Sequence, residues 1–137
     1  MCTHTRLQLV QNAAARVVTG TRMRDHISPA LAALHWLPVK RRVQFKTVTF
    51  VYKALNNLAP DYIVDLLDRP PNIRSLRSSD QLALRVPRSN SVRTGDRAFA
   101  VLGPTLWNKL PLDIKSAPTI ETFKNRLKTY LFTVEDF

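Results

Sequence analysis

Residues 38–56, PVKRRVQFKTVTFVYKALN, decide the fold of this chain. Pro38 suits the start of a helix, where a missing backbone N–H costs nothing. Asn56 and Asn57 suit its end, because Asn tolerates left-handed backbone geometry. Between these ends, apolar side chains recur at helical spacing in two adjacent stripes. The stripes comprise Val43, Thr47, Phe50, Val51, Ala54 and Leu58, and Phe45, Val48, Tyr52 and Leu55. Two stripes predict a central helix that is contacted from two sides.

Two further helices are expected before this segment. An apolar face predicts a helix over about residues 5–19, and Gly20 is a favourable residue to follow its last turn. Ser28 as N-cap and Pro29 at the first helical position predict a short helix that reaches about His35. The apolar face of the first helix comprises Leu7, Val10, Ala14, Val17 and Val18.

Helices are also expected after the central segment. Pro60 begins a short amphipathic turn, and Pro104 begins a helix that ends at Pro111. Thr119 is expected to cap the last helix. The apolar stripe of that helix comprises Ile120, Phe123, Leu127, Tyr130 and Leu131.

The stretch between these two helical regions breaks the pattern. Alternation of Leu82, Leu84 and Val86 with other side chains predicts a short edge strand. The sequence therefore predicts a mainly α, small helical single domain over residues 1–137, with five to six helices and room for one short β-hairpin within residues 80–102. Its helical parts are residues 5–67 and 104–132, joined by a basic loop over 68–102. The expected core comprises Val10, Ala14, Val17, Trp36, Leu37, Phe50, Val51, Ala54, Leu106, Trp107, Phe123, Leu127 and Leu131.

Positive charge dominates the composition, with 21 Lys and Arg against 10 Asp and Glu, a net charge of +11. Such a surplus favours polyanionic partners. The single cysteine, Cys2, excludes an internal disulfide and favours a reducing compartment. Apolar runs fall short of the roughly 20 residues that a membrane span needs, so no membrane partner is expected.

Catalytic patterns are missing from the sequence. Nucleotidyl transfer uses metal ions held by clustered carboxylates, and the chain has no adjacent Asp pair. Asp61, Asp65 and Asp68 are interpreted as a solvated polar edge, and His35 as a packing residue. Gly103 before Pro104 indicates a helix start instead of a phosphate cradle. We therefore expect no bound metal, no cofactor and no enzymatic activity.

Basic residues are the stronger functional signal. Arg outnumbers Lys among them, which suits bidentate phosphate contacts, although an ordinary solvated surface is the alternative. Arg41 and Arg42 are expected to be exposed, because the apolar stripe of their helix runs through Val43, Phe50 and Val51. The candidate nucleic-acid-binding residues are Arg22, Arg24, Lys40, Arg41, Arg42, Arg69, Arg74, Arg77, Arg85, Arg88, Arg93 and Arg97.

Several motifs occur in one order along nearly the whole chain. They are LQLVQNAAAR (residues 7–16), HWLPV (35–39), YKALNNLAPDY (52–62), GDRAF (95–99), LWNKLP (106–111) and FKNRLKTYL (123–131). In this order they resemble the region after the polymerase core in LINE-type (non-LTR) retrotransposon reverse transcriptases. Asn57 stands where that family usually has Gly, and both residues tolerate a positive φ.

The resemblance implies a particular place in a larger enzyme. The palm of such a polymerase, with its paired aspartates, would lie before Met1, so a non-catalytic fragment is expected. The segment would pack beside the template–primer path and hold RNA or an RNA/DNA hybrid through backbone contacts. A host-used protein-interaction module, with incidental positive charge, is the alternative.

Overall fold

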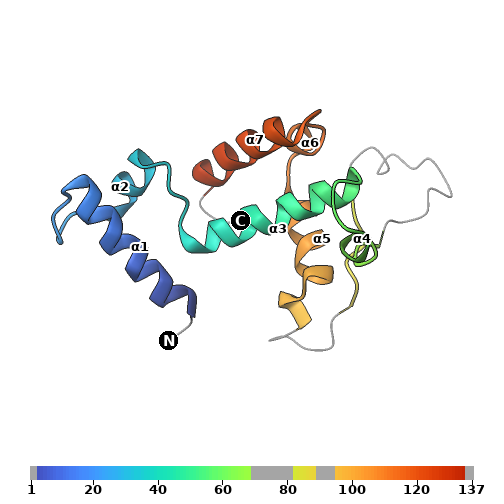
Figure 1. The fold of residues 1–137 in the computed structure, drawn as a ribbon, viewed down its shortest axis with the longest axis horizontal. Helices are drawn as coiled ribbons and strands as arrows, with labels where there is room; N and C mark the ends of the chain where they lie inside the picture. Colours follow the sequence, from blue (N-terminus) through green and yellow to red (C-terminus); the bar gives the residue numbers. More distant parts are fainter. Residues whose placement is uncertain (1–2, 69–81, 89–94, 135–137) are drawn as a thin grey trace.

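Helices account for the regular structure of the chain in its computed structural model, which describes residues 3–68, 82–88 and 95–134 (Figure 1). The elements are α1 (Thr3–Thr19), α2 (Ile27–Ala33), α3 (Val39–Leu55), α4 (Asp61–Val64), the 3-10 helix η2 (Gly95–Arg97), α5 (Phe99–Lys109), α6 (Leu112–Lys115) and α7 (Ile120–Thr133). The mainly α prediction is confirmed. Within the described residues, α4 and α6 are single four-residue turns.

The central position predicted for α3 is also confirmed, since α1, α4, α5 and α7 all contact it. Val48, Val51 and Ala54 of α3 are completely buried. Phe50, by contrast, is 45% exposed, so its assignment to the core is wrong. The helices α5 and α7 cover the face of α3 that includes Val48 and Val51, and Phe50 lies beside that face.

Three aromatic rings join α3, α5 and α7. Tyr52 stacks on Phe123 with ring centroids 4.2 Å apart, and Trp107 lies tilted against the same ring at 6.0 Å. The Tyr52 hydroxyl donates to the Ala117 carbonyl at 2.8 Å, and the Trp107 indole N–H donates to the Leu82 carbonyl at 2.7 Å. The Tyr52 and Trp107 rings are thus buried while their polar atoms are hydrogen-bonded.

Most of the expected core is found where the sequence placed it. The buried residues that were predicted are Leu37, Val51, Ala54, Leu106, Trp107, Phe123, Leu127 and Leu131. Trp36 is half-buried. The three residues of α1 that were predicted to be buried, Val10, Ala14 and Val17, are exposed, so these predictions are wrong.

The helix α1 contacts its neighbours through a different face from the one expected. Ala15 is fully buried, and Gln11 donates to the Leu37 carbonyl at 2.9 Å. The Gln8 side chain accepts from the backbone N–H of Val39 at 2.8 Å. This bond gives a partner to the first N–H group of α3, which has none within its own helix. Polar contacts therefore attach α1 and α2 to the rest, and the two helices form an arm that extends beyond the other helices (Figure 1).

The helix α5 begins five residues earlier than predicted, at Phe99. Phe99 and Leu102 pack against the core, and this burial extends the helix ahead of Pro104. Pro104 lies inside α5 and withholds the N–H that would bond to the carbonyl of Ala100. At Gly103, an added Cβ would lie only 3.0 Å from a Val51 methyl group, so this glycine permits the close approach of α5 to α3.

Residues 82–88 are extended but form no strand, so the predicted edge strand is wrong. The backbone of Leu84 bonds to the Asn108 side chain, with its N–H donating at 2.9 Å and its carbonyl accepting at 2.8 Å. An amide side chain of α5 thus occupies the place of a partner strand. The remainder of the expected hairpin falls on η2, on α5 and on residues outside the described ranges.

Helix ends follow local backbone chemistry. Asn57 after α3 and Gly20 after α1 have φ values of 57° and 68°, as the sequence predicted. The predicted cap of α7 is confirmed, since the Thr119 side chain accepts from the Thr122 N–H at 3.2 Å.

The ends of α2 differ from the prediction. The helix begins at Ile27, so Ser28 is not its N-cap. His35 has a φ of 52° and an exposed side chain, so its interpretation as a packing residue is wrong. The N–H groups of His35 and Trp36 donate to the Ala32 and Leu31 carbonyls, the pattern that ends a helix with a left-handed residue.

Replacing Trp107 with alanine should lower the free energy of unfolding by about 3–5 kcal/mol, because the change leaves a cavity beside Phe123. This is a large part of the roughly 5–15 kcal/mol that stabilises an ordinary domain. Urea denaturation followed by circular dichroism measures the effect. Tyr62→Ala is the matched control, since Tyr62 is 69% exposed and its loss should cost under about 0.5 kcal/mol. Equal unfolding midpoints for the two variants would contradict the core described above.

Candidate nucleic-acid interface

The first turn of α3 carries the densest group of predicted phosphate contacts. Lys40 and Arg42 are exposed there, as expected for Arg42. Arg41 is half-buried, and its Nη1 donates to the Leu131 carbonyl near the end of α7 at 2.7 Å. A helix C-terminus carries partial negative charge, so this contact offsets the repulsion between Arg41 and the positive start of its own helix. The expected exposure of Arg41 is therefore wrong, and Arg41 connects two helices.

Two further candidates, Arg22 and Arg24, lie exposed in the loop between α1 and α2. Arg16 of α1 holds this loop, because its guanidinium donates to the carbonyls of Arg22 and Asp25. The Asp25 carboxylate also accepts from the Arg22 backbone N–H at 3.2 Å. The loop is thus fixed by contacts to its backbone, while both candidate side chains face solvent.

The remaining described candidates lie around α5. Arg85 and Arg88 belong to the extended segment 82–88, and Arg97 ends η2; all three are exposed. Arg85 forms an exposed ion pair with Asp68 at 3.6 Å, a contact of little energetic weight that still reduces its net charge toward a ligand. The other candidates fall outside the described residues and comprise Arg69, Arg74, Arg77 and Arg93.

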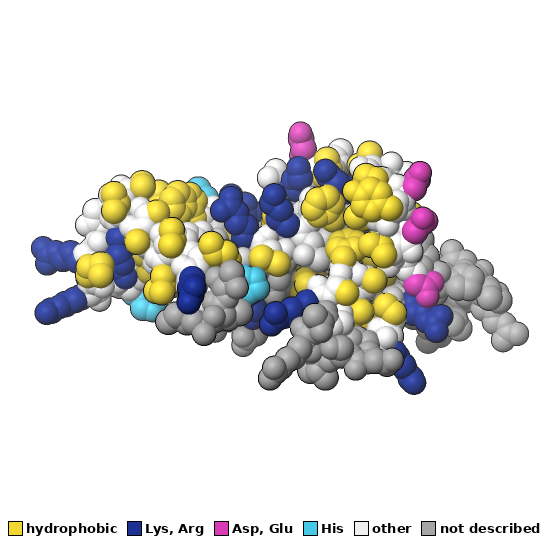
Figure 2. Space-filling model, turned by 60° about the horizontal axis from the view of Figure 1, so that its bottom comes forward, with side chains coloured by type: hydrophobic (Ala, Val, Ile, Leu, Met, Phe, Trp, Pro, Cys, Tyr) yellow, Lys and Arg dark blue, Asp and Glu magenta, His cyan; other side chains and the backbone are white. Residues whose placement is uncertain are grey.

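The structure does not gather the described candidates into one cluster. The α1–α2 loop, the start of α3 and the segment 82–88 follow one another along the length of the molecule (Figure 1). Figure 2 shows basic side chains spread along one face, with acidic side chains mainly at the end away from the arm. This arrangement suits contacts with an extended polyanion at several points.

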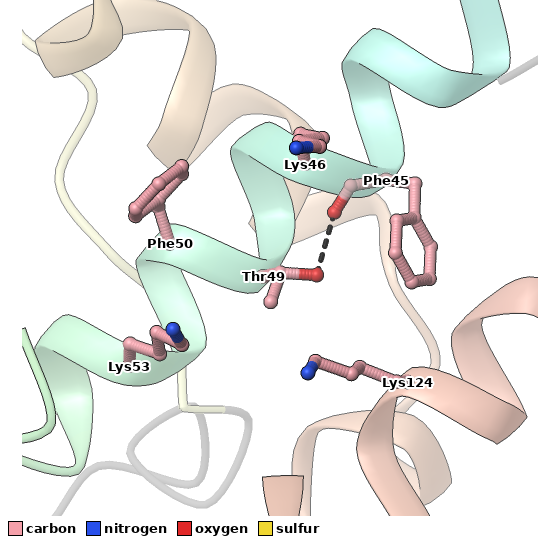
Figure 3. Close-up of a pocket in the computed structure, with 6 residues that line it drawn as sticks. All are labelled: Phe45, Lys46, Thr49, Phe50, Lys53 and Lys124. Carbon is pink, nitrogen blue, oxygen red and sulfur yellow. Dashed lines mark hydrogen bonds between the residues drawn. The ribbon is translucent and has the colours of Figure 1, made fainter. Parts of the chain in front are cut away.

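A cleft between α3 and α7 was not predicted from the sequence. It has a volume of about 290 Å³ and is lined by Phe45, Lys46, Thr49, Phe50, Lys53 and Lys124 (Figure 3). Five of these residues come from α3, and Lys124 extends toward the cleft from α7. None of the six is acidic, so the three ammonium groups give the cleft a positive charge.

The sequence held only part of the signal for this cleft. Lys46, Thr49, Phe50 and Lys53 fall at i, i+3, i+4 and i+7, which places them on one side of a helix. Because Phe50 also fits an apolar stripe, the pattern predicted that it would be buried in the core. Lys124 is 71 residues beyond Lys53, and only the packing of α7 against α3 brings it to this place.

One basic residue is removed from the surface. Lys115 is 7% exposed, and burial lowers the pKa of its ammonium group. Its Nζ lies 3.4 Å from the Asn108 carbonyl near the end of α5, where a cation is favourable. Lys115 therefore stabilises a helix end and is unsuited to a phosphate contact.

The acidic residues of the described chain form no second candidate site. Asp61, Asp65 and Asp68 are all exposed, as the interpretation of a solvated edge predicted. Within residues 3–68, 82–88 and 95–134, no three His, Cys, Asp or Glu side chains gather into a group that could hold a metal ion. No helix in the described part of the chain is long and apolar enough to cross a membrane.

Comparison with known proteins provides no match. No protein-family model, curated protein or solved structure matches this chain.

Separate substitution of Arg41 and Arg42 should show that only Arg41 contributes to the stability of the fold. Arg41→Gln should lower the free energy of unfolding by about 1–3 kcal/mol, because it removes a charge-assisted hydrogen bond to the Leu131 carbonyl. Arg42→Gln is the matched control and should change it by less than about 0.5 kcal/mol. Chemical denaturation of the two variants measures the difference. If both variants had the same free energy of unfolding as the unmodified chain, the hydrogen bond from Arg41 to α7 would make no contribution to stability.

Proposed function

We propose that this chain is a non-catalytic C-terminal segment of a LINE-type retrotransposon reverse transcriptase. It binds RNA or an RNA/DNA hybrid weakly, through phosphate groups and with little sequence preference. The observation that carries the binding part is the composition of α3, which has five basic side chains and no acidic one over Val39–Leu55. The basic side chains of α3 that are exposed, among them Lys40, Arg42 and Lys46, attract a polyanion of any sequence.

The family part of the proposal is supported by the contacts that the motif residues make. Gln8 and Gln11 of LQLVQNAAAR bond to the backbone of Val39 and Leu37, which belong to HWLPV. Tyr52 of YKALNNLAPDY and Trp107 of LWNKLP both pack against Phe123 of FKNRLKTYL. Motifs that are distant in sequence hold one another in place, which gives a physical reason for their occurrence together.

A host-used protein-interaction module is the second candidate, and the arm favours it. Several apolar side chains of the arm are exposed, and Figure 2 shows hydrophobic groups spread over this part of the surface. They include Leu7, Leu9, Val10, Val17, Val18 and Met23, which are 52–84% exposed. A concentration of exposed apolar side chains is typical of surfaces that bind another protein. The nucleic-acid proposal is preferred because it uses the charge of α3, which an apolar partner would leave unmatched.

Binding to RNA should weaken steeply as salt is added. If about 4 to 6 phosphates are neutralised, affinity should fall on the order of a hundredfold or more between about 50 and 200 mM salt. Replacing Lys40 and Arg42 with glutamine should flatten the slope of log affinity against log salt by roughly one to two units. Fluorescence anisotropy with a labelled single-stranded RNA and a duplex measures both effects.

A double exchange in α7, Arg126→Gln with Lys128→Gln, removes the same charge from another helix and is the control. Arg126 already pairs with Asp113 at 3.1 Å, so the slope should change less than in the α3 variant. RNA binding that is independent of salt concentration, or absent at about 50 mM salt, would contradict the nucleic-acid proposal. The protein-interaction module would then take its place.

The purified chain should also show no polymerase activity, because its sequence has no adjacent aspartate pair to hold two catalytic metal ions. Incorporation of dTTP on primed poly(rA), with magnesium or manganese, is the measurement. A heat-denatured sample and a mock purification are the controls. Template-dependent incorporation that is present only in the native protein would refute the non-catalytic assignment.

A further inference from the structure

The cleft between α3 and α7 has the size and charge of a site for one small anion with an aromatic part. Its volume of about 290 Å³ lies at the lower limit of small-molecule sites, which range over about 300–1,000 Å³. Lys46, Lys53 and Lys124 surround it, and no carboxylate is among the lining residues. An anionic ligand would reduce the repulsion among these three ammonium groups.

Phe50 provides the aromatic surface in this cleft. Phe50 is 45% exposed although it belongs to the central helix α3, and the Lys53 Nζ lies 5.9 Å from its ring centroid. Lys46 precedes it by four positions and Lys53 follows it by three, so the two lysines are its neighbours on one side of α3, and both line the cleft. Aromatic rings flanked by cations bind single-stranded nucleic acids by stacking on a base while the cations contact phosphates.

Lys124 supplies a charge from the opposite wall. Figure 3 shows its side chain extending from α7 toward the space in front of Thr49, with Lys53 on the other side of that space. A nucleotide whose base covers the Phe50 ring would therefore have cations from two helices near its phosphates.

Thr49 can distinguish one base from another. Its hydroxyl already donates to the Phe45 carbonyl at 2.7 Å, so the oxygen can only accept a further hydrogen bond. The exocyclic amino group of cytosine can donate to it. Uracil has a carbonyl in the equivalent position, which cannot donate a hydrogen bond to the Thr49 oxygen.

We propose that this cleft binds one unstacked nucleotide of a single-stranded RNA or DNA. The base stacks on Phe50 with its amino edge toward Thr49, and Lys46, Lys53 and Lys124 bind the adjacent phosphates. The inference rests on the proposed function, because it names the form of nucleic acid that the basic surface holds. A duplex cannot use the cleft, since its bases are stacked inside the helix.

Fluorescence anisotropy with labelled oligo(C), oligo(U) and a blunt RNA duplex tests the inference. Phe50→Ala should weaken oligo(C) binding about 5- to 150-fold, the range measured for loss of one base–aromatic stack, and should leave duplex binding within about twofold. Phe50→Trp should retain the affinity, and its added fluorescence should be quenched by oligo(C), after subtraction of the unmodified chain. Tyr62→Ala removes another exposed aromatic ring and should have no effect.

Thr49→Val tests the orientation of the base. The unmodified chain should prefer oligo(C) to oligo(U) by about two- to tenfold, the value of one hydrogen bond, and the variant should lose this preference. Equal binding of oligo(C) and oligo(U) by the unmodified chain would overturn the proposed orientation.

The outcomes separate this inference from the function on which it rests. If Phe50→Ala binds oligo(C) like the unmodified chain, with the salt dependence intact, the nucleotide site is overturned and the proposed function stands. If the unmodified chain binds neither single strand nor duplex at about 50 mM salt, both are overturned. If a labelled oligoglutamate binds as tightly as oligo(C) and loses affinity equally in Phe50→Ala, the cleft serves acidic peptides instead.

Discussion

The packing of two aromatic rings against Phe123 is the contact on which the described structure depends. Tyr52 comes from α3 and Trp107 from α5, and each reaches the same completely buried ring of α7. Helices as short as α5 and α7 have little stability alone in water, so burial of these rings supplies the free energy that holds them together. The polar atoms of the same rings fix the connecting segments, since they bond to the carbonyls of Ala117 and Leu82.

This packing also determines which side of α3 can meet a ligand. The core occupies the face with Val48, Val51 and Tyr52, which leaves Lys46 and Phe50 at its margin. Because α7 lies beside that margin, its own lysine completes a positively charged cleft. The candidate site is therefore a consequence of how the core is built, and it requires no separate loop or inserted segment.

The arm is attached by a different kind of contact. Gln8 and Gln11 bond to the backbone around Pro38, and the helices of the arm contribute no residue to the main hydrophobic core. Hydrogen bonds give modest net stability while specifying orientation strongly. The apolar side chains of α1 consequently remain exposed, and they are the surface on which the protein-interaction alternative depends.

The sequence by itself determined the helical class, the central place of α3, the apolar stripe of α7 and several helix ends. These features depend on periodicity and on local backbone chemistry, which neighbouring residues determine. The positive φ of Asn57 and the cap at Thr119 are examples.

Tertiary structure decided the rest. A stripe shows that a helix has an apolar side, but only the neighbouring helices decide whether Phe50 is buried or whether Val10 and Val17 are exposed. Three features join residues that are far apart in the chain: Arg41 bonds to α7, Leu84 bonds to Asn108, and Lys53 and Lys124 line one cleft. Packing sets these distances, and spacing along the sequence does not predict them.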